Sequence, residues 1–133
     1  MLNHEPLRLA DGEYRFACLV WDNEPLPSGQ LVALAAEGLG WKKSTTYTVL
    51  KKLCERGVLQ NADGRVTSLI KKEDVQQAES AAVVDKTFDG SLPRFVAAFL
   101  NSKPISDAEA AEIRTLLDAS VQFEGPIQKG KTS

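Results

Sequence analysis

The segment from Lys43 to Arg56 combines the side chains of a packed helix face with those of a polar, cationic surface. Side chains suited to packing recur at helical intervals, at Thr46, Val49, Leu50 and Leu53. The remaining surface is rich in hydroxyl and amine groups, at Lys43, Ser44, Thr45, Tyr47, Thr48, Lys51 and Lys52. Hydroxyl groups can bond to base edges in a major groove, while lysines neutralise phosphates. This chemistry suits a DNA-reading helix, although a solvated amphipathic helix would show the same pattern when taken alone.

Positive charge is concentrated around this helix. Residues 42–72, which begin with Lys42 and Lys43, contain eight basic side chains against two acidic ones, Glu55 and Asp63. Residues 1–41 contain two basic and six acidic side chains, and residues 73–133 contain six and ten, so each flank is acidic. A local patch steers an anionic partner even in a chain whose net charge is -2. The distribution therefore favours double-stranded DNA as a partner, approached through one surface.

The neighbouring segments predict a winged helix-turn-helix domain over residues 7–70. A helix is expected to begin at Asp11 and to end before Pro25, and a second helix is expected over residues 28–39. A turn of a few residues then leads into the basic helix. After Gly57, two strand-like runs flank Asn61-Ala62-Asp63-Gly64, which predicts a hairpin with Arg65 at its tip. Such a hairpin is either a DNA-contacting wing or a plain closure of the core sheet, and the preceding basic helix favours the wing.

A second, helical part is predicted over residues 71–120. Three helices are expected there, and their large apolar side chains exceed what such short helices can bury among themselves: Phe95, Val96, Phe99, Leu100, Ile113, Leu116 and Leu117. We expect these side chains to form a homodimer interface, with packing back onto the first domain as the alternative. Residues 121–133 are predicted to be a disordered tail. The expected fold class is mainly α, with a small β-hairpin.

The sequence lacks the residues that several functional classes require. The single histidine is His4, and no cluster of Asp, Glu, His and Cys has metal-ligand spacing, so neither an enzyme nor a metal or cofactor site is expected. Cys18 and Cys54 fall within apolar helical patterns and are expected to be buried free thiols. No segment resembles a signal peptide or has the length of a membrane span, so we expect a cytoplasmic protein without membrane insertion.

The order of these elements resembles the penicillinase-repressor family of transcriptional regulators, the BlaI, MecI and CopY type. The similarity covers about residues 7–119, and its most specific motif is Trp-Lys-x-Ser-Thr-x-x-Thr-x-Leu, which begins at Trp41. The other matching stretches are 9–13 leading to 19–21, 63–65, 95–99 and 109–117. The resemblance implies a dimeric winged-helix repressor that binds inverted-repeat operators, often of the TACA/TGTA kind.

The resemblance also implies roles for individual residues. Base contacts fall on Ser44, Thr45, Tyr47 and Thr48, and backbone contacts fall on Lys43 and Arg65. Phosphate contacts by Lys42, Lys51 and Lys52 are our electrostatic inference. Family members are released from DNA when a membrane-bound sensor protease signals, and the family's cleavage point maps onto the Ala98–Phe99 bond.

The sequence departs from the family pattern at three places. Thr46 occupies a position that usually holds a branched aliphatic residue, and Ala98 replaces the asparagine typical of the cleavage point. The last 13 residues contain no cysteine, unlike the cysteine-rich tail of the copper-responsive branch, so copper sensing is not expected. The remaining alternative is a winged-helix module that binds protein instead of DNA, which the basic block between acidic flanks disfavours.

Overall fold

The computed structural model describes residues 8–131, with side chains for residues 8–121. The described chain is mainly helical with a small antiparallel sheet, which confirms the expected fold class. Its elements are α1 (Asp11–Asn23), β1 (Leu26–Pro27), α2 (Ser28–Leu39), α3 (Lys43–Glu55), β2 (Leu59–Ala62), β3 (Arg65–Ser68), α4 (Lys72–Thr87), α5 (Leu92–Ser102) and α6 (Asp107–Lys131). The chain divides into two compact units, one up to Asp89 and one from Gly90 onward.

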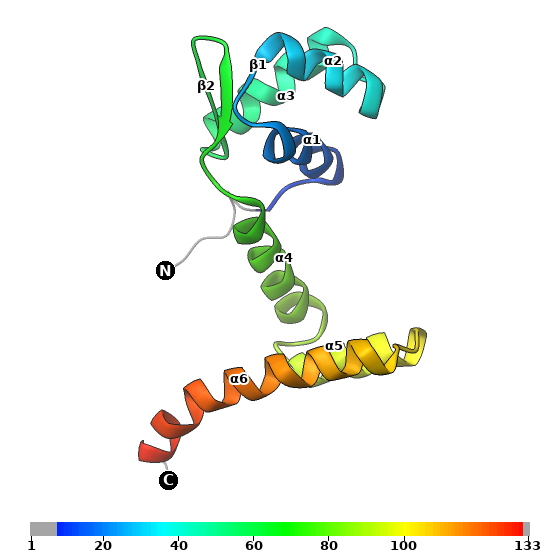
Figure 1. Ribbon diagram of the computed structural model, residues 1–133, viewed down its shortest axis with the longest axis vertical. Coiled ribbons are helices and arrows are strands. Elements are labelled where there is room, and N and C mark those ends of the chain that lie inside the picture. The colour runs from blue at the N-terminus through cyan, green and yellow to red at the C-terminus, as the bar shows by residue number, and fades with distance from the viewer. Residues whose placement is uncertain (1–7, 132–133) are drawn as a thin grey trace. The chain divides into compact units, whose positions relative to one another are not determined.

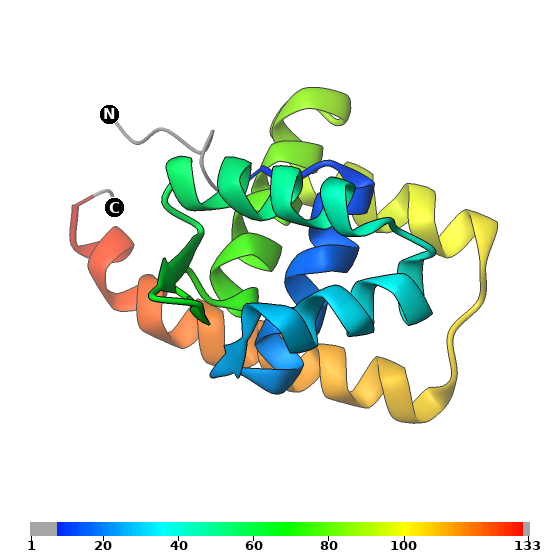
Figure 2. The same cartoon turned by 90° about the horizontal axis from the view of Figure 1, so that it is seen from above.

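The core of the first unit lies where α1, α2 and α3 meet the sheet (Figure 1). Phe16, Leu31, Leu53 and Val66 contribute fully buried side chains from four different elements. The indole of Trp41, in the turn between α2 and α3, stacks on Phe16 with ring centroids 5.3 Å apart. Figure 2 shows α2 and α3 joined by this short turn. Gly40 makes the turn possible because its φ of 72° is disfavoured for residues with a Cβ.

The wing is a β-hairpin with a two-residue turn, and a third strand, β1, pairs with one of its strands. Strand β2 pairs with β3, with Leu59 opposite Ser68 and Ala62 opposite Arg65. Asp63 and Gly64 form the turn, with φ angles of 53° and 83°, as expected for a tight hairpin. The sequence did not predict β1, in which Leu26 pairs with Val66. A two-residue strand after a proline has no periodicity of its own, so only the pairing reveals it.

The first unit extends beyond the boundary expected at residue 70. Val75 and Ala78 of α4 are buried, and Val75 belongs to the core of the head. The indole N–H of Trp21 donates to the carbonyl oxygen of Ile70 at 3.0 Å, which fixes the chain just before α4. The boundary therefore follows Asp89, because α4 provides apolar area that the head would otherwise expose to water.

The second unit consists of α5 and α6. The side chain of Ser91 accepts a hydrogen bond from the N–H of Arg94, and Ser106 accepts one from the N–H of Glu109, so each helix has a serine cap. Helix α6 runs from Asp107 to Lys131 and so includes most of the segment that was predicted to be a disordered tail, whose last two residues lie outside the described residues. Extending an existing helix adds a hydrogen bond for each residue that it fixes, so weak helix formers can follow a strong segment.

Two further observations concern the chain as a whole. Cys18 and Cys54 are free, as expected, but both are half-buried instead of fully buried, because they lie at the edges of their helices' apolar faces. Among the residues that the structure describes, no helix is long and apolar enough to cross a membrane.

Candidate nucleic-acid interface

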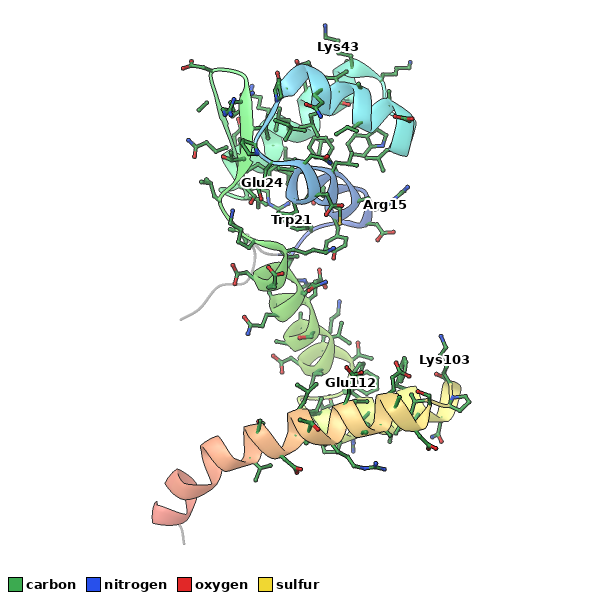
Figure 3. All side chains as sticks on the ribbon, in the orientation of Figure 1. Arg15, Trp21, Glu24, Lys43, Lys103 and Glu112 are labelled. Atoms are coloured by element: carbon green, nitrogen blue, oxygen red, sulfur yellow. The ribbon has the colours of Figure 1, made fainter. Side chains whose placement is uncertain are left out.

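Helix α3 separates its packing face from its polar face. Thr46, Leu50 and Leu53 are buried, with exposed fractions of 2% or less. The side chains predicted to contact DNA are exposed, namely Lys42, Lys43, Ser44, Thr45, Tyr47, Thr48, Lys51 and Lys52. Figure 3 shows Lys43 pointing away from the body of the first unit. Because residues four apart lie above one another on a helix, Ser44, Thr48 and Lys51 occupy the middle of the exposed face.

Thr46 explains how α3 accommodates a hydroxyl beneath its polar face. The residue is fully buried, and its hydroxyl donates to the carbonyl oxygen of Lys42 at 3.2 Å. A buried hydroxyl without a partner would be destabilising, whereas this one is satisfied within its own helix. The departure from the family pattern at this position therefore leaves the packing of α3 intact.

Tyr47 connects α3 to the wing through α2. Its hydroxyl lies 3.2 Å from the hydroxyl of Ser28, the first residue of α2. The N–H of Ser28 donates to the carbonyl oxygen of Gly64 at 2.7 Å, and Gly64 precedes Arg65. These contacts place the exposed face of α3, the start of α2 and the wing tip on one continuous surface.

Arg65 projects from the tip of the wing. It is exposed and occupies the first position of β3, opposite Ala62 in β2 and Pro27 in β1. Within the described residues, Arg65 forms no salt bridge. Its guanidinium group is therefore available to an external anion, and so are the ammonium groups of Lys42, Lys43 and Lys51.

Lys52 differs from the other predicted contacts because an acidic side chain compensates its charge. Its Nζ atom lies 2.9 Å from Oε2 of Glu13 in α1. Arg56 binds the same carboxylate, with 3.1 Å between its Nη1 atom and Oε1. Sequence reasoning missed this pair, although Glu13 in the first turn of a helix and two basic residues at i and i+4 were visible.

Burial raises the pKa of Glu13, but hydrogen bonds and charge outweigh this effect. The backbone N–H of Ala10 donates to Oε1 at 2.9 Å, and Lys52 and Arg56 stabilise the charged form. The net result is a pKa below the ordinary value of the carboxyl group. Glu13 is therefore ionised at neutral pH and holds α1 against the C-terminal half of α3.

The start of α2 is a second feature that the sequence analysis did not assign to the interface. Ser28, Gly29 and Gln30 form its first turn; the N–H of Ser28 bonds to Gly64, while the N–H groups of Gly29 and Gln30 have no partner within the helix. Such groups favour phosphate, and this turn adjoins both Tyr47 and the wing tip. The sequence signal that could have identified this turn was a helix start directly after Pro25 and Pro27.

The described residues offer no comparable basis for metal chemistry. They contain no group of three or more His, Cys, Asp and Glu side chains that could hold a metal ion. Burial, together with the nearby charge of Glu55, raises the pKa of Cys54, although a backbone hydrogen bond from Asn61 opposes the shift. Cys54 is consequently a protonated thiol at neutral pH, which is a poor nucleophile and a poor ligand.

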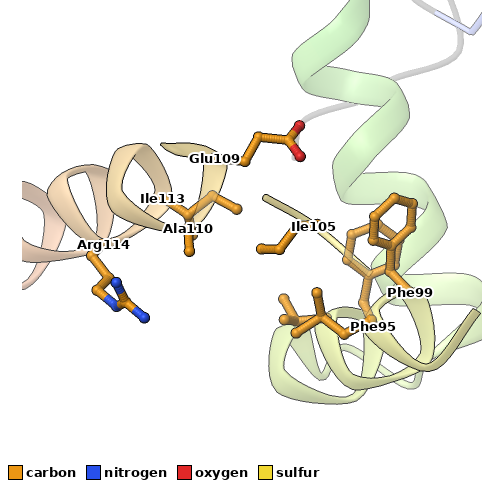
Figure 4. A pocket seen from close by; sticks show the side chains of 9 residues that line it. Phe95, Phe99, Ile105, Glu109, Ala110, Ile113 and Arg114 are labelled. Carbon is orange, nitrogen blue, oxygen red and sulfur yellow. The ribbon is translucent and has the colours of Figure 1, made fainter. Parts of the chain in front are cut away.

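The second unit presents a large exposed apolar surface. Exposed fractions are 41% for Val96, 47% for Phe99 and 43% for Leu100 in α5. Ile113, Leu116 and Leu117 of α6 are exposed to 43%, 69% and 50%. A groove of about 330 Å³ lies between the two helices, and Figure 4 shows Phe95 and Phe99 facing Ala110 and Ile113 across it. Ala98 and Phe99, the predicted cleavage point, lie in the middle of α5.

The first unit has the elements of a winged helix-turn-helix domain: three helices, a short turn before the third, and a β-hairpin after it. Comparison with known proteins identifies its family. The penicillinase repressor family matches residues 9–119, which is most of the chain. The chain therefore belongs to the penicillinase repressor family, which consists of transcriptional repressors.

Individual members of the family are distant in sequence but similar in length. The penicillinase repressor of Bacillus licheniformis is 23% identical over 115 residues, covering 84% of this chain and 90% of that protein. The methicillin resistance regulatory protein MecI of Staphylococcus aureus is 18% identical over 121 residues, covering 88% and 98%. MecI of Mammaliicoccus sciuri is 17% identical over 121 residues, covering 88% of this chain and 98% of that protein.

Proposed function

We propose that this transcriptional repressor is a homodimer that binds inverted-repeat DNA operators through α3 and the wing. The observation that carries the proposal is the continuous surface formed by the exposed face of α3, the start of α2 and Arg65. This surface combines hydroxyl groups with cations that have no salt bridge in the described part of the chain. That combination matches base edges and phosphates together.

In this proposal, α3 enters the major groove with its N-terminal half. Ser44 and Thr48 face the bases from the middle of the exposed face of α3, and Thr45 and Tyr47 flank them. Lys42, Lys43, Lys51 and Arg65 neutralise phosphates on either side. Ser28 orients the Tyr47 hydroxyl before DNA arrives, which reduces the side-chain entropy that binding would otherwise remove.

A second copy of the chain covers the exposed apolar surface of α5 and α6. The side chains involved are Phe95, Val96, Phe99, Leu100, Ile113, Leu116 and Leu117. Support comes from the exposure of all these side chains except the half-buried Phe95, because side chains of this size are usually buried in monomeric proteins. Two linked heads engage two half-sites with a high effective concentration, so the dimer binds far more tightly than single heads.

Induction releases the operator by cleavage of the Ala98–Phe99 bond, by a membrane-bound sensor protease or a protein under its control. The bond lies within α5, so the helix must open locally before a protease can act. Cleavage separates Phe99, Leu100 and all of α6 from the rest of the chain. The dimer then loses much of its buried apolar area, at about 25 cal/mol per Å².

Binding measurements with DNA fragments selected from promoter regions test the proposal. Thr45→Ala and Tyr47→Ala are expected to reduce discrimination between operator and unrelated DNA by about 1–3 kcal/mol. Lys43→Ala and Arg65→Ala are expected to weaken binding to all sequences and to lower the salt slope by about one each. Unchanged sequence preference in Thr45→Ala, together with altered preference in Arg65→Ala, would contradict the assigned reading face.

A further inference from the structure

Glu13 is a buried carboxylate whose two oxygens meet cations of the recognition helix. It belongs to α1, yet it pairs with Lys52 at 2.9 Å and with Arg56 at 3.1 Å. Its third partner is the backbone N–H of Ala10, at 2.9 Å. Glu13 is only 8% exposed, so these groups replace the water that would otherwise solvate its charge.

Lys52 lies where its charge could reach DNA. It follows Thr48 by four residues, so the two side chains are neighbours on the surface of α3. The Lys52 side chain is 59% exposed, and its Nζ atom contacts the carboxylate of Glu13. An ammonium group that is already paired with a carboxylate does not neutralise a phosphate, so it releases no counterion from the DNA.

Arg56 is held more firmly than Lys52. Besides binding Glu13, its Nη2 atom donates to the carbonyl oxygen of Arg8 at 2.6 Å, and its side chain is 27% exposed. Lys52 is therefore tied to α1, and Arg56 is tied to α1 and to the segment that leads into it. Lys43, at the other end of the helix, is exposed and forms no salt bridge in the described residues.

We propose that Glu13 is a positioning residue that withholds Lys52 from the DNA backbone and so limits non-specific binding. The inference rests on the proposed DNA-binding function. Non-specific affinity grows with the number of phosphates that a protein neutralises, whereas base discrimination does not. By occupying Lys52, Glu13 restricts the phosphate contacts to Lys42, Lys43, Lys51 and the wing. By anchoring Arg56, it sets the face that α3 presents.

The test measures the affinity of the full-length protein for an unrelated DNA duplex across a series of salt concentrations. The variants are Glu13→Gln, Lys52→Met and the double substitution. Glutamine keeps an oxygen that can accept from Ala10 but has no charge for Lys52. Glu37→Gln is the matched control, because it removes the same charge from an exposed residue of α2 without a salt bridge in the described chain.

Glu13→Gln is expected to steepen the plot of log affinity against log salt by about one, relative to Glu37→Gln, and to tighten binding about fivefold near 0.15 M salt. The double substitution is expected to restore the wild-type slope. Lys52→Met alone is expected to leave that slope unchanged, and a fall in its slope would overturn the proposal even when Glu13→Gln does not fold.

A slope that falls by about one in Lys52→Met would overturn the proposal, because Lys52 would then already contact phosphate. Equal slopes in Glu13→Gln and Glu37→Gln would also overturn it. The proposed function fails in a different way, when the wild-type affinity does not depend on salt and Lys43→Ala and Arg65→Ala have no effect. That outcome would end both proposals together.

Discussion

Single residues in the head combine structural and electrostatic roles. Tyr47 presents its ring on the exposed face of α3 while its hydroxyl contacts Ser28, and Thr46 satisfies its own hydroxyl beneath that face. Glu13 is the clearest case, because one carboxylate binds the start of α1 and two cations of α3. Substitution at such positions changes the orientation of a neighbouring element as well as the local contact.

Glu13 predicts how the stability of the head depends on pH. Its pKa is lower in the folded protein than the ordinary value of 4.5, so the ionised form stabilises the fold above that pH. This contribution is lost as pH falls from about 4.5 through the lowered pKa. At pH 7, Glu13→Gln is expected to lower the free energy of unfolding by about 1–3 kcal/mol.

Urea unfolding of the wild type and of Glu13→Gln between pH 7 and pH 3 checks this expectation. The difference between the two proteins should shrink as the pH falls below 4.5, and it should be smallest below the lowered pKa, where both have a neutral group at residue 13. A difference that stays constant over this range would show that the charge of Glu13 does not stabilise the head.

At the scale of elements, the wing depends on its two-residue turn. Gly64 has a φ of 83°, and a Cβ added there would meet no atom within 4 Å, so an alanine would be strained but not crowded. Gly64→Ala is therefore expected to lower the free energy of unfolding by about 1–2 kcal/mol through backbone strain alone. It should also weaken DNA binding, because the position of Arg65 depends on this turn.

Gly29→Ala provides the matched control for the turn. Gly29 lies in the first turn of α2, has the same open surroundings and has no positive φ. Thermal unfolding should show an unchanged or slightly higher stability for Gly29→Ala, since alanine favours helices. Equal losses of stability in the two variants would argue against strain at Gly64 as the cause.

For the whole molecule, the boundary after Asp89 determines which fragments of the chain are expected to fold. A fragment ending at Asp89 keeps Val75 and Ala78 in the core and is expected to fold as a stable monomer. A fragment ending at Ile70 loses the burial of Val75, at about 1.5–3 kcal/mol, and should be less stable.

Sedimentation of the full chain at micromolar concentration should show a dimer, and a monomeric full chain would contradict the proposed assembly.

Cleavage of α5 can be tested in cells that contain the sensor system. After induction, mass spectrometry should find a fragment ending at Ala98, and operator occupancy should fall while the recognition helix stays unchanged. Cells without the inducer serve as the control. Intact chains in cells whose operators have been released would contradict cleavage and would indicate release by a ligand.

The sequence alone was sufficient to predict the features that depend on residues close together in the chain. The periodicity of residues 46–53 predicted the buried and exposed faces of α3, and Asp63-Gly64 predicted the wing turn, because both patterns depend on local backbone geometry. The winged-helix class and the family followed from the order of such local features.

Only the tertiary structure decided which side chains meet across long stretches of chain. Glu13 and Arg56 are 43 residues apart, Leu26 pairs with Val66, and the buried Val75 extends the head to Asp89. No local pattern encodes these contacts, because they depend on how several helices pack at once. Lys52 and Lys51 are therefore equivalent in the sequence, and the folded head distinguishes them through a carboxylate brought from another helix.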